Sequence, residues 1–260
     1  MKLCRFHLDG AIVFGVIEGE TVTAIAGDPF GEFERTDRIL PLSEVRLAVP
    51  VIPGTFYCVG QNYREHIIAA ARRKGIKPSF PAKPDIGYRA NNALVAHGDA
   101  IVKPADAGAK FQYEGELVAV IGRTAKNVPR EEALDCVFGW TIGNDVSERT
   151  WQREDRTFWR AKNADTFKPM GPWIVTGLDP GEMETVVRVN GVETDRFRTG
   201  DMIFYVATFI AEVTKYNTIH PGDVFWMGTD GTPRDIRPGD MVEIEISGIG
   251  VLRNPVAGGG

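Results

Sequence analysis

The chain lacks the features that mark disulfide-rich, zinc-binding and membrane-spanning proteins. Its 260 residues include only three cysteines, Cys4, Cys58 and Cys136, which form no CxxC motif and are expected to be small buried side chains. The four histidines are scattered, without an HExxH pair. No apolar run approaches the roughly 18 residues of a membrane span, and the N-terminus has no signal-peptide core, so we expect a cytoplasmic protein.

An excess of positive charge is also missing. The chain has 30 Lys and Arg against 35 Asp and Glu, which gives a net charge of -5. This balance provides no general attraction for phosphate backbones, and the basic run at residues 72–74 is too short to change that. A nucleic-acid-binding role is therefore not supported. The hydrophobic share of 43% suits one large globular domain or a main domain with a small appendage.

Strand signals dominate the first part of the chain. Apolar and polar residues alternate in three segments before residue 26, separated by Asp9-Gly10 and by residues 18–20, and this pattern predicts β-hairpins. The stretch over residues 41–54 has the prolines of a linker. We therefore predict a small N-terminal β domain over residues 1–50 and a catalytic domain over residues 51–260.

The rest of the chain predicts a mixed fold that is richer in strands than in helices. Helices are expected over residues 61–74, over 131–135 with their flanks, and over 202–215. Apolar runs predict strands at residues 119–121, 137–142, 186–189, 224–226 and 241–246. Strands and helices do not alternate regularly, and no GxGxxG follows a strand. We expect an α+β, mostly β fold with a rolled or barrel-like sheet.

Three acids stand at the ends of apolar runs. Glu114 and Glu116 are two positions apart just before a strand, so both side chains should point to one face, where their mutual repulsion needs water or a cation. Gly115 between them leaves room on the opposite face. Asp145 follows the apolar run at residues 137–142, and hard ions such as magnesium or manganese prefer several oxygens from fixed positions. The spacing permits a metal site on these three acids, with a solvated strand edge as the alternative.

Seven motifs in a fixed order give a more specific pattern. They are Gly60-Gln61-Asn62-Tyr63 with His66; Tyr113-Glu114-Gly115-Glu116-Leu117; Asn144-Asp145-Val146-Ser147 with Arg149 and Gln152; Lys162 with Asp165-Thr166-Phe167; Gly171-Pro172-Trp173; Gly228-Thr229; and Gly248-Ile249-Gly250 with Leu252-Arg253-Asn254-Pro255. With these motifs the chain resembles the fumarylacetoacetate hydrolase family, near its acylpyruvase and 2-hydroxyhepta-2,4-diene-1,7-dioate isomerase branch. The resemblance implies a homodimeric enzyme with a rolled β-sheet core. It also implies a magnesium, manganese or calcium ion on the three acids and chemistry on acylpyruvates and related 2-oxo acids.

The resemblance also implies roles for single residues. His66 and Lys162 match catalytic residues: the histidine activates water, and the lysine stabilises enolate or carboxylate charge. The positions that the resemblance implies for substrate binding are Tyr63, Arg89, Arg149, Gln152 and Thr229.

The chain departs from the family pattern around the same pocket. The hydrolases pair the histidine with a glutamate three residues later on a helix, and here that position is Ala69. Glu148, Thr150 and Asp230 also replace residues that are common in the family, and Arg89 takes the place of a common lysine. None of these changes affects the three acids, but they leave the substrate and the route of proton transfer open.

Three hypotheses about function follow. The first is a divalent-metal-dependent hydrolase that cleaves a C–C bond of an acylpyruvate or related β-diketo acid. The second, favoured by Ala69, is an isomerase or tautomerase of a 2-hydroxy-diene-dioate, or a decarboxylase of an oxaloacetate-like acid. The third is a metabolite-binding homologue without turnover. Residues 66–84, with Gly75 and several prolines, fit either a mobile lid over the site or a rigid surface loop.

Overall fold

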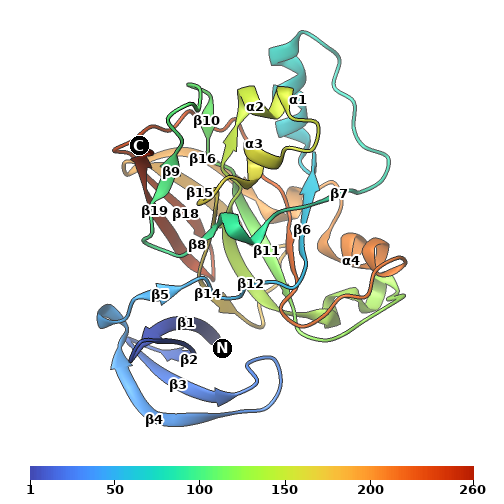
Figure 1. The fold of residues 1–260 in the computed structure, drawn as a ribbon. Helices are drawn as coiled ribbons and strands as arrows, with labels where there is room; N and C mark the ends of the chain where they lie inside the picture. The colour runs from blue at the N-terminus through green and yellow to red at the C-terminus, as the bar shows by residue number, and fades with distance from the viewer.

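Strands form most of the regular structure in the computed structural model, which describes the backbone of residues 1–260 and every side chain except that of Lys74 (Figure 1). The largest sheet has twelve strands, and ten of them follow the order β4-β3-β2-β1-β14-β12-β11-β17-β6-β7, while β5 pairs with β1 and β8 with β14. These strands are β1 (Lys2–Leu8), β2 (Ala11–Glu18), β3 (Thr21–Gly27), β4 (Phe33–Pro41), β5 (Leu47–Ala48), β6 (Phe56–Gly60), β7 (Asp85–Tyr88), β8 (Leu94–Val95), β11 (Gly115–Ile121), β12 (Val137–Asn144), β14 (Lys168–Val175) and β17 (Val224–Trp226).

Two smaller sheets complete the β structure. One has the strand order β16-β15-β18-β19-β9, and the other pairs β10 with β13. Their strands are β9 (Ile101–Lys103), β10 (Phe111–Gln112), β13 (Ser147–Glu148), β15 (Glu184–Val189), β16 (Val192–Arg198), β18 (Met241–Ile246) and β19 (Gly250–Gly258). The prediction of a mostly β, α+β fold is confirmed, although the sheets do not close into a barrel.

Strand β11 is buried on both faces, which explains its unbroken apolar sequence. Leu117 and Ala119 belong to a large hydrophobic cluster that also contains Val187 of β15 and Ile244 of β18. The side chains between them in the sequence, such as Val118, belong to a second cluster. A central strand between two packed layers needs apolar residues at every position, and this is why β11 shows no alternation. Glu114 directly precedes this strand, and Glu116 is its second residue.

Four α-helices and four 3-10 helices accompany these sheets. The α-helices are α1 (Arg64–Lys74), α2 (Arg149–Glu154), α3 (Trp159–Asn163) and α4 (Val206–Thr214), and the 3-10 helices are η1 (Leu42–Glu44), η2 (Asn91–Ala93), η3 (Arg130–Cys136) and η4 (Thr199–Asp201). The helix expected around residues 131–135 is therefore a 3-10 helix. The short helices α2 and α3 were not predicted, because five or six residues are too few to show a helical period. Among the described residues, no helix has the length and apolar character needed to cross a bilayer.

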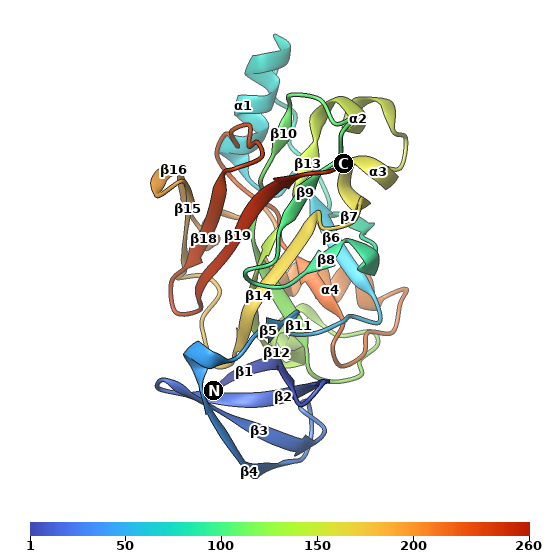
Figure 2. The same ribbon diagram turned by 60° about the vertical axis from the view of Figure 1, so that its left-hand side comes forward.

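The predicted strands of the main domain are present as β11, β12, β15, β17 and β18, and the N-terminal hairpins as β1 to β3. Figures 1 and 2 show the N-terminal strands together at one end of the molecule, with α1 at the opposite end. They have a small hydrophobic cluster of their own, which includes Cys4 and Phe6. Strand β1 nevertheless pairs with β14, so these strands extend the main sheet. The three cysteines are free and buried, as expected.

Candidate active site

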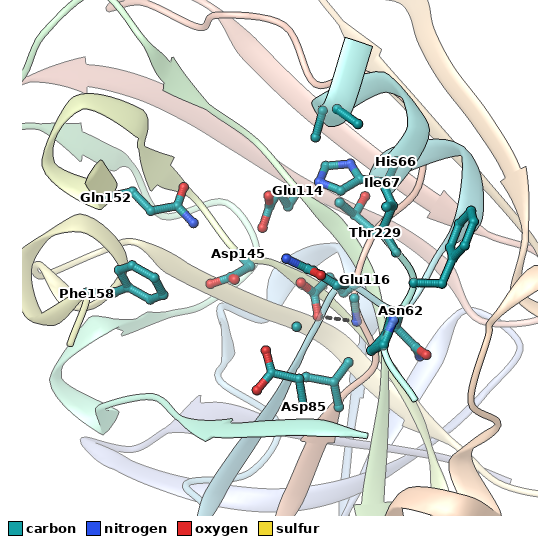
Figure 3. A pocket seen from close by; sticks show the side chains of 18 of the residues that line it. Asn62, His66, Ile67, Asp85, Glu114, Glu116, Asp145, Gln152, Phe158 and Thr229 are labelled. Carbon is teal, nitrogen blue, oxygen red and sulfur yellow. Dashed lines mark hydrogen bonds between the residues drawn. The ribbon is translucent and has the colours of Figure 1, made fainter. Parts of the chain in front are cut away.

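Glu114, Glu116 and Asp145 converge on one cavity, as Figure 3 shows. One carboxylate oxygen from each residue lies within 4.8 Å of those from the other two. All three residues are buried, with 3 to 6% of their surface exposed. A solvated strand edge would leave the carboxylates in water, so burial excludes that alternative.

The pairing of β11 with β12 brings the acids together. The two strands are antiparallel, and Gly115 is opposite Asn144, so the start of one strand meets the end of the other. The Asp145 backbone N–H donates to the Glu114 carbonyl at 2.8 Å, and the Asn144 side-chain oxygen accepts from the Glu114 N–H at 3.0 Å. Residues two apart in an extended segment point to the same face, and this adds Glu116 to the group.

The backbone at Gly115 is closely packed on the face opposite the acids. A Cβ atom built on it would lie 3.0 Å from Val187 and 3.1 Å from Ile244. The second sheet therefore packs directly against the backbone at this point. The Val187 and Ile244 side chains occupy the space that the sequence predicted opposite the acids, and this packing holds residues 114–116 in place.

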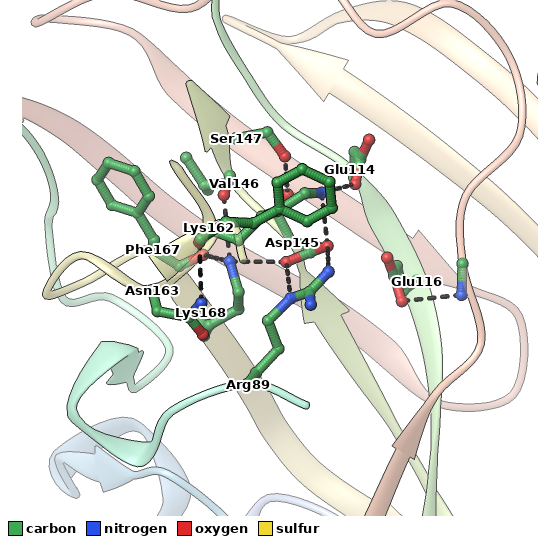
Figure 4. A network of polar contacts seen from close by, with 12 residues as sticks. Arg89, Glu114, Glu116, Asp145, Val146, Ser147, Lys162, Asn163, Phe167 and Lys168 are labelled. Carbon is green, nitrogen blue, oxygen red and sulfur yellow. Dashed lines mark hydrogen bonds and ion pairs between the residues drawn. The ribbon is translucent and has the colours of Figure 1, made fainter. Parts of the chain in front are cut away.

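Four basic side chains pair with Glu114 or Asp145. Figure 4 shows Arg89, Lys162 and Lys168 beside these acids. The Lys162 ammonium bridges the two acids, at 2.5 Å from Glu114 and 2.6 Å from Asp145. Arg89 donates two hydrogen bonds to Asp145, at 3.1 and 2.9 Å. Arg149 lies 2.6 Å from Glu114, and Lys168 lies 2.6 Å from Asp145. Buried charges need such partners, and together these contacts hold two of the three carboxylates ionised.

Glu116 has no comparable partner. It accepts a hydrogen bond from the Gly228 backbone N–H at 2.8 Å, and no basic side chain among those described is within ion-pair distance. Burial raises the pKa of Glu116 to about 8, and the neighbouring Asp145 and Glu114 charges act in the same direction. Burial acts to raise the pKa of Glu114 as well, but Arg149 and Lys162 outweigh this effect and lower the pKa to about 2. Glu116 therefore needs a further cation nearby to ionise at neutral pH, which fits a site built to receive one.

Glu116→Gln is expected to stabilise the metal-free protein and to abolish its stabilisation by divalent ions. Because the folded pKa is raised from 4.5 to about 8, the wild-type protein loses stability as the pH rises between these values, and the variant does not. We expect an advantage of roughly 2 to 4 kcal/mol for the variant near pH 8.

Thermal unfolding from pH 5 to pH 8, with chelator and with added manganese, measures both effects. Glu243→Gln, which changes a partly exposed acid of the second sheet, is the control. A variant less stable than wild type at pH 8 in chelator would contradict the expectation.

The cavity has a volume of about 500 Å³, which suits a small molecule. Besides the acids, the predicted site residues that line it are His66, Arg89, Arg149, Gln152, Lys162 and Thr229. The Arg149 guanidinium connects Glu114 to Gln152, whose side-chain oxygen accepts at 2.9 Å.

Residues 76–77 and 79–81, within the segment predicted to be a lid or a surface loop, form another part of the cavity wall. The Arg64 guanidinium lies 4.9 Å from the centre of the Phe80 ring.

Tyr63 does not reach the cavity, although the sequence predicts a substrate contact. It is 1% exposed and packs edge-on against Phe197, with the ring centres 5.3 Å apart. The backbone at this residue is still extended, one residue before α1 begins, so the side chain does not follow the helix face and packs in the core.

Two parts of the site were missed by sequence reasoning. Lys168 is fully buried, donates to the carbonyl oxygens of Val146 and Phe167, and pairs with Asp145. A lone lysine at the start of an apolar strand is a signal that could have indicated it. The second part is the segment after Thr229, where the Asp230 carboxylate accepts from the His66 backbone N–H at 2.8 Å. In the sequence, Asp230 stands out only as a departure from the family pattern.

The fold and the site together define a class of protein: a mostly β chain with a buried carboxylate cluster, surrounded by basic groups, at the end of two central strands. The profile of the fumarylacetoacetate (FAA) hydrolase C-terminal family matches residues 55–257, and the profile named Rv2993c-like, N-terminal, matches residues 1–50. The chain belongs to the fumarylacetoacetate hydrolase family.

Several known members are similar over the whole chain. The crystal structure of 2-hydroxyhepta-2,4-diene-1,7-dioate isomerase from Mycobacterium marinum has 39% identity and a TM-score of 0.90, and covers 100% of this chain and 99% of its own. Oxaloacetate tautomerase YisK of Bacillus subtilis (strain 168) is 30% identical over 96% of this chain and 87% of its own. Maleylpyruvate hydrolase from Sphingobium sp. SYK-6, in complex with manganese(II) and pyruvate, has 26% identity and a TM-score of 0.81, with both chains fully covered.

Proposed function

We propose that this protein is a divalent-metal-dependent hydrolase that cleaves the C–C bond of an acylpyruvate or a related β-diketo acid. The observation that carries the proposal is a buried acid triad with a bridging lysine, in the same cavity as a histidine. The similarity to a maleylpyruvate hydrolase that binds manganese and pyruvate supports the same chemistry. The cavity volume of about 500 Å³ fits a small oxo acid.

Glu114, Glu116 and Asp145 would hold the metal ion. Their donor set is all oxygen, which suits magnesium or manganese, and calcium less specifically. The raised pKa of Glu116, caused by burial and the neighbouring acids, indicates a negative charge that the protein alone does not neutralise. When bound, a divalent ion supplies a Lewis acid that binds the substrate carboxylate and 2-oxo group and favours the enolate.

The basic and polar side chains of the cavity would bind and orient the anionic substrate. The Lys162 ammonium, 95% removed from solvent, shares the charge that develops on the departing enolate. Arg149, Gln152 and Thr229 line the same cavity and offer donors to substrate oxygens. Arg89 is engaged twice by Asp145, so we assign it mainly to holding that carboxylate in place.

His66 would move the proton. Its ring takes a proton from water as the water oxygen bonds to the acyl carbonyl carbon. The C–C bond then breaks, its electron pair stays on the pyruvate fragment as an enolate, and the histidine returns the proton to that carbon. The balance is acylpyruvate plus water giving a carboxylic acid and pyruvate. The absence of a carboxylate at Ala69 does not leave the ring without a partner, since Nδ1 lies 3.2 Å from the Gly231 carbonyl oxygen.

A second candidate is tautomerisation or isomerisation of a 2-oxo or 2-hydroxy-enoate acid, or decarboxylation of an oxaloacetate-like acid. Ala69 is the observation that favours it, because these reactions need a stabilised enolate but no activated water. The similarity to an oxaloacetate tautomerase and to a hydroxyheptadienedioate isomerase supports it as well. A silent metabolite-binding homologue is the remaining alternative.

Metal removal and replacement tests the proposal. Chelator-treated protein is expected to lose at least ~100-fold of its activity towards acetylpyruvate and fumarylpyruvate, and added magnesium or manganese is expected to restore it. Enol absorbance and product analysis follow the reaction, with oxaloacetate as a parallel substrate. Pyruvate released with a carboxylic acid supports the hydrolase. Isomer or carbon dioxide formation alone supports the second candidate, and tight oxalate binding without any turnover supports the binding protein.

A homodimer stays a prediction from the family resemblance. Light scattering of the purified protein measures its oligomeric state.

A further inference from the structure

The loop after Thr229 contacts His66 in two places. The Asp230 carboxylate accepts from the His66 backbone N–H at 2.8 Å, and the Gly231 carbonyl oxygen lies 3.2 Å from Nδ1 of the ring. His66 is in the first turn of α1, where backbone N–H groups have no partner within the helix. Asp230, from a distant part of the chain, therefore supplies the cap that this helix lacks at its own N-cap residue, Tyr63.

A carbonyl oxygen only accepts hydrogen bonds, so the proton in the Gly231 contact must be on Nδ1. In the neutral ring, Nε2 then carries a lone pair and can act as a base. Burial lowers the pKa of His66, with an opposing effect from Glu114, so the neutral form is favoured at neutral pH. The family resemblance implies a glutamate three residues after the histidine, and this chain has Ala69 there. The loop offers a different means of orienting the ring.

The loop is itself fixed at both ends. At one end, the Gly228 N–H donates to Glu116 at 2.8 Å. At the other, the Thr232 N–H donates to Asp195 at 3.0 Å, and that carboxylate also accepts from the Tyr113 hydroxyl at 2.6 Å. Gly231 has φ +76, and a Cβ atom there would lie 2.3 Å from Asp195, so only glycine fits. The contacts connect the segment that carries the acids to the histidine.

We infer that Asp230 and the Gly231 carbonyl form a positioning device that holds His66 as the Nδ1-protonated tautomer with Nε2 free to act as the base, in place of the usual glutamate. The inference rests on the proposed function for the identity of the reaction. Asp230 is a positioning residue, since it acts through His66 and not on the substrate.

A double-mutant cycle tests the role in turnover. Asp230→Ala is expected to lower kcat roughly 10- to 100-fold with KM within about 3-fold, because a misplaced base affects the chemical step. Asp230→Asn keeps an acceptor oxygen and is expected to remain within about 3-fold of wild type. In a His66→Ala background, Asp230→Ala is expected to cause no further loss. An equal loss in both backgrounds would overturn the inference.

Long-range proton–nitrogen NMR of the His66 ring gives a test that needs no turnover. The His66→Ala spectrum assigns the signals among the four histidines. We expect a protonated Nδ1 and an unprotonated Nε2 in wild type and in Asp230→Asn, and the opposite tautomer or a mixture in Asp230→Ala. A protonated Nε2 in wild type would overturn the inference. If the wild type turns over no oxo acid but shows this tautomer pattern, the proposed function fails and the positioning device stands.

Discussion

Asp145→Asn is expected to abolish turnover, by at least ~1000-fold, and to cause the largest loss of stability of any single change in the site. Asp145 is 4% exposed and pairs with Arg89, Lys162 and Lys168. Burial acts to raise the pKa of Asp145, but these three cations outweigh it and hold the pKa well below its ordinary range. Asparagine keeps the shape of the side chain but removes the charge that these groups share.

The stability loss follows from the cations left without a partner. Lys168 is fully buried and would retain only two carbonyl oxygens. Breaking a buried ion pair from one side costs about 3 to 5 kcal/mol, which corresponds to a fall in Tm of roughly 10 °C for a chain of this size. Differential scanning calorimetry measures the fall, and calorimetric titration with manganese measures metal binding.

Asp85→Asn is the matched control for this change. Asp85 lines the same cavity but is exposed, so its replacement should leave Tm within about 1 °C of wild type. The double variant Asp145→Asn with Lys168→Met separates stability from activity. It should recover part of the lost Tm without recovering turnover, because it removes the unpaired ammonium but not the lost ligand. Retained metal binding and turnover in Asp145→Asn would contradict the assignment of this residue.

Lys162→Met is expected to bind the divalent ion more tightly and yet to turn over roughly 100- to 1000-fold more slowly. The ammonium bridges Glu114 and Asp145, so it neutralises the same carboxylates that a metal ion needs. Without it, the two acids repel each other more strongly, and a divalent cation gains from relieving that repulsion. The slower turnover follows from the loss of the positive charge next to the developing enolate.

Metal titration and steady-state kinetics measure the two opposite effects. Lys110→Met removes a lysine from an exposed ion pair with Asp235 and should change neither quantity by more than about 2-fold. A lysine with a purely structural role would make metal binding weaker when it is lost. Weaker binding together with unchanged kcat is therefore the outcome that contradicts this prediction.

The sequence by itself determined the central strands and the acid triad. Local pattern was sufficient here, because apolar runs identify central strands such as β11 and β12, and two acids two residues apart in an extended segment share a face. The ordered motifs identified the family. The position of Asp145 beside Glu114 could be predicted as well, since a single register of two adjacent strands produces it.

Only the tertiary structure decided how the charges are shared. Lys168 pairs with Asp145, Glu116 accepts from Gly228 with no cation beside it, and the Gly231 carbonyl contacts His66. These contacts join residues that are between about 20 and 165 positions apart in the chain. Tyr63 enters the core for the same reason: its direction depends on packing against Phe197, not on local spacing. Whether a buried polar group is satisfied depends on every element packed around it, and no local pattern contains that information.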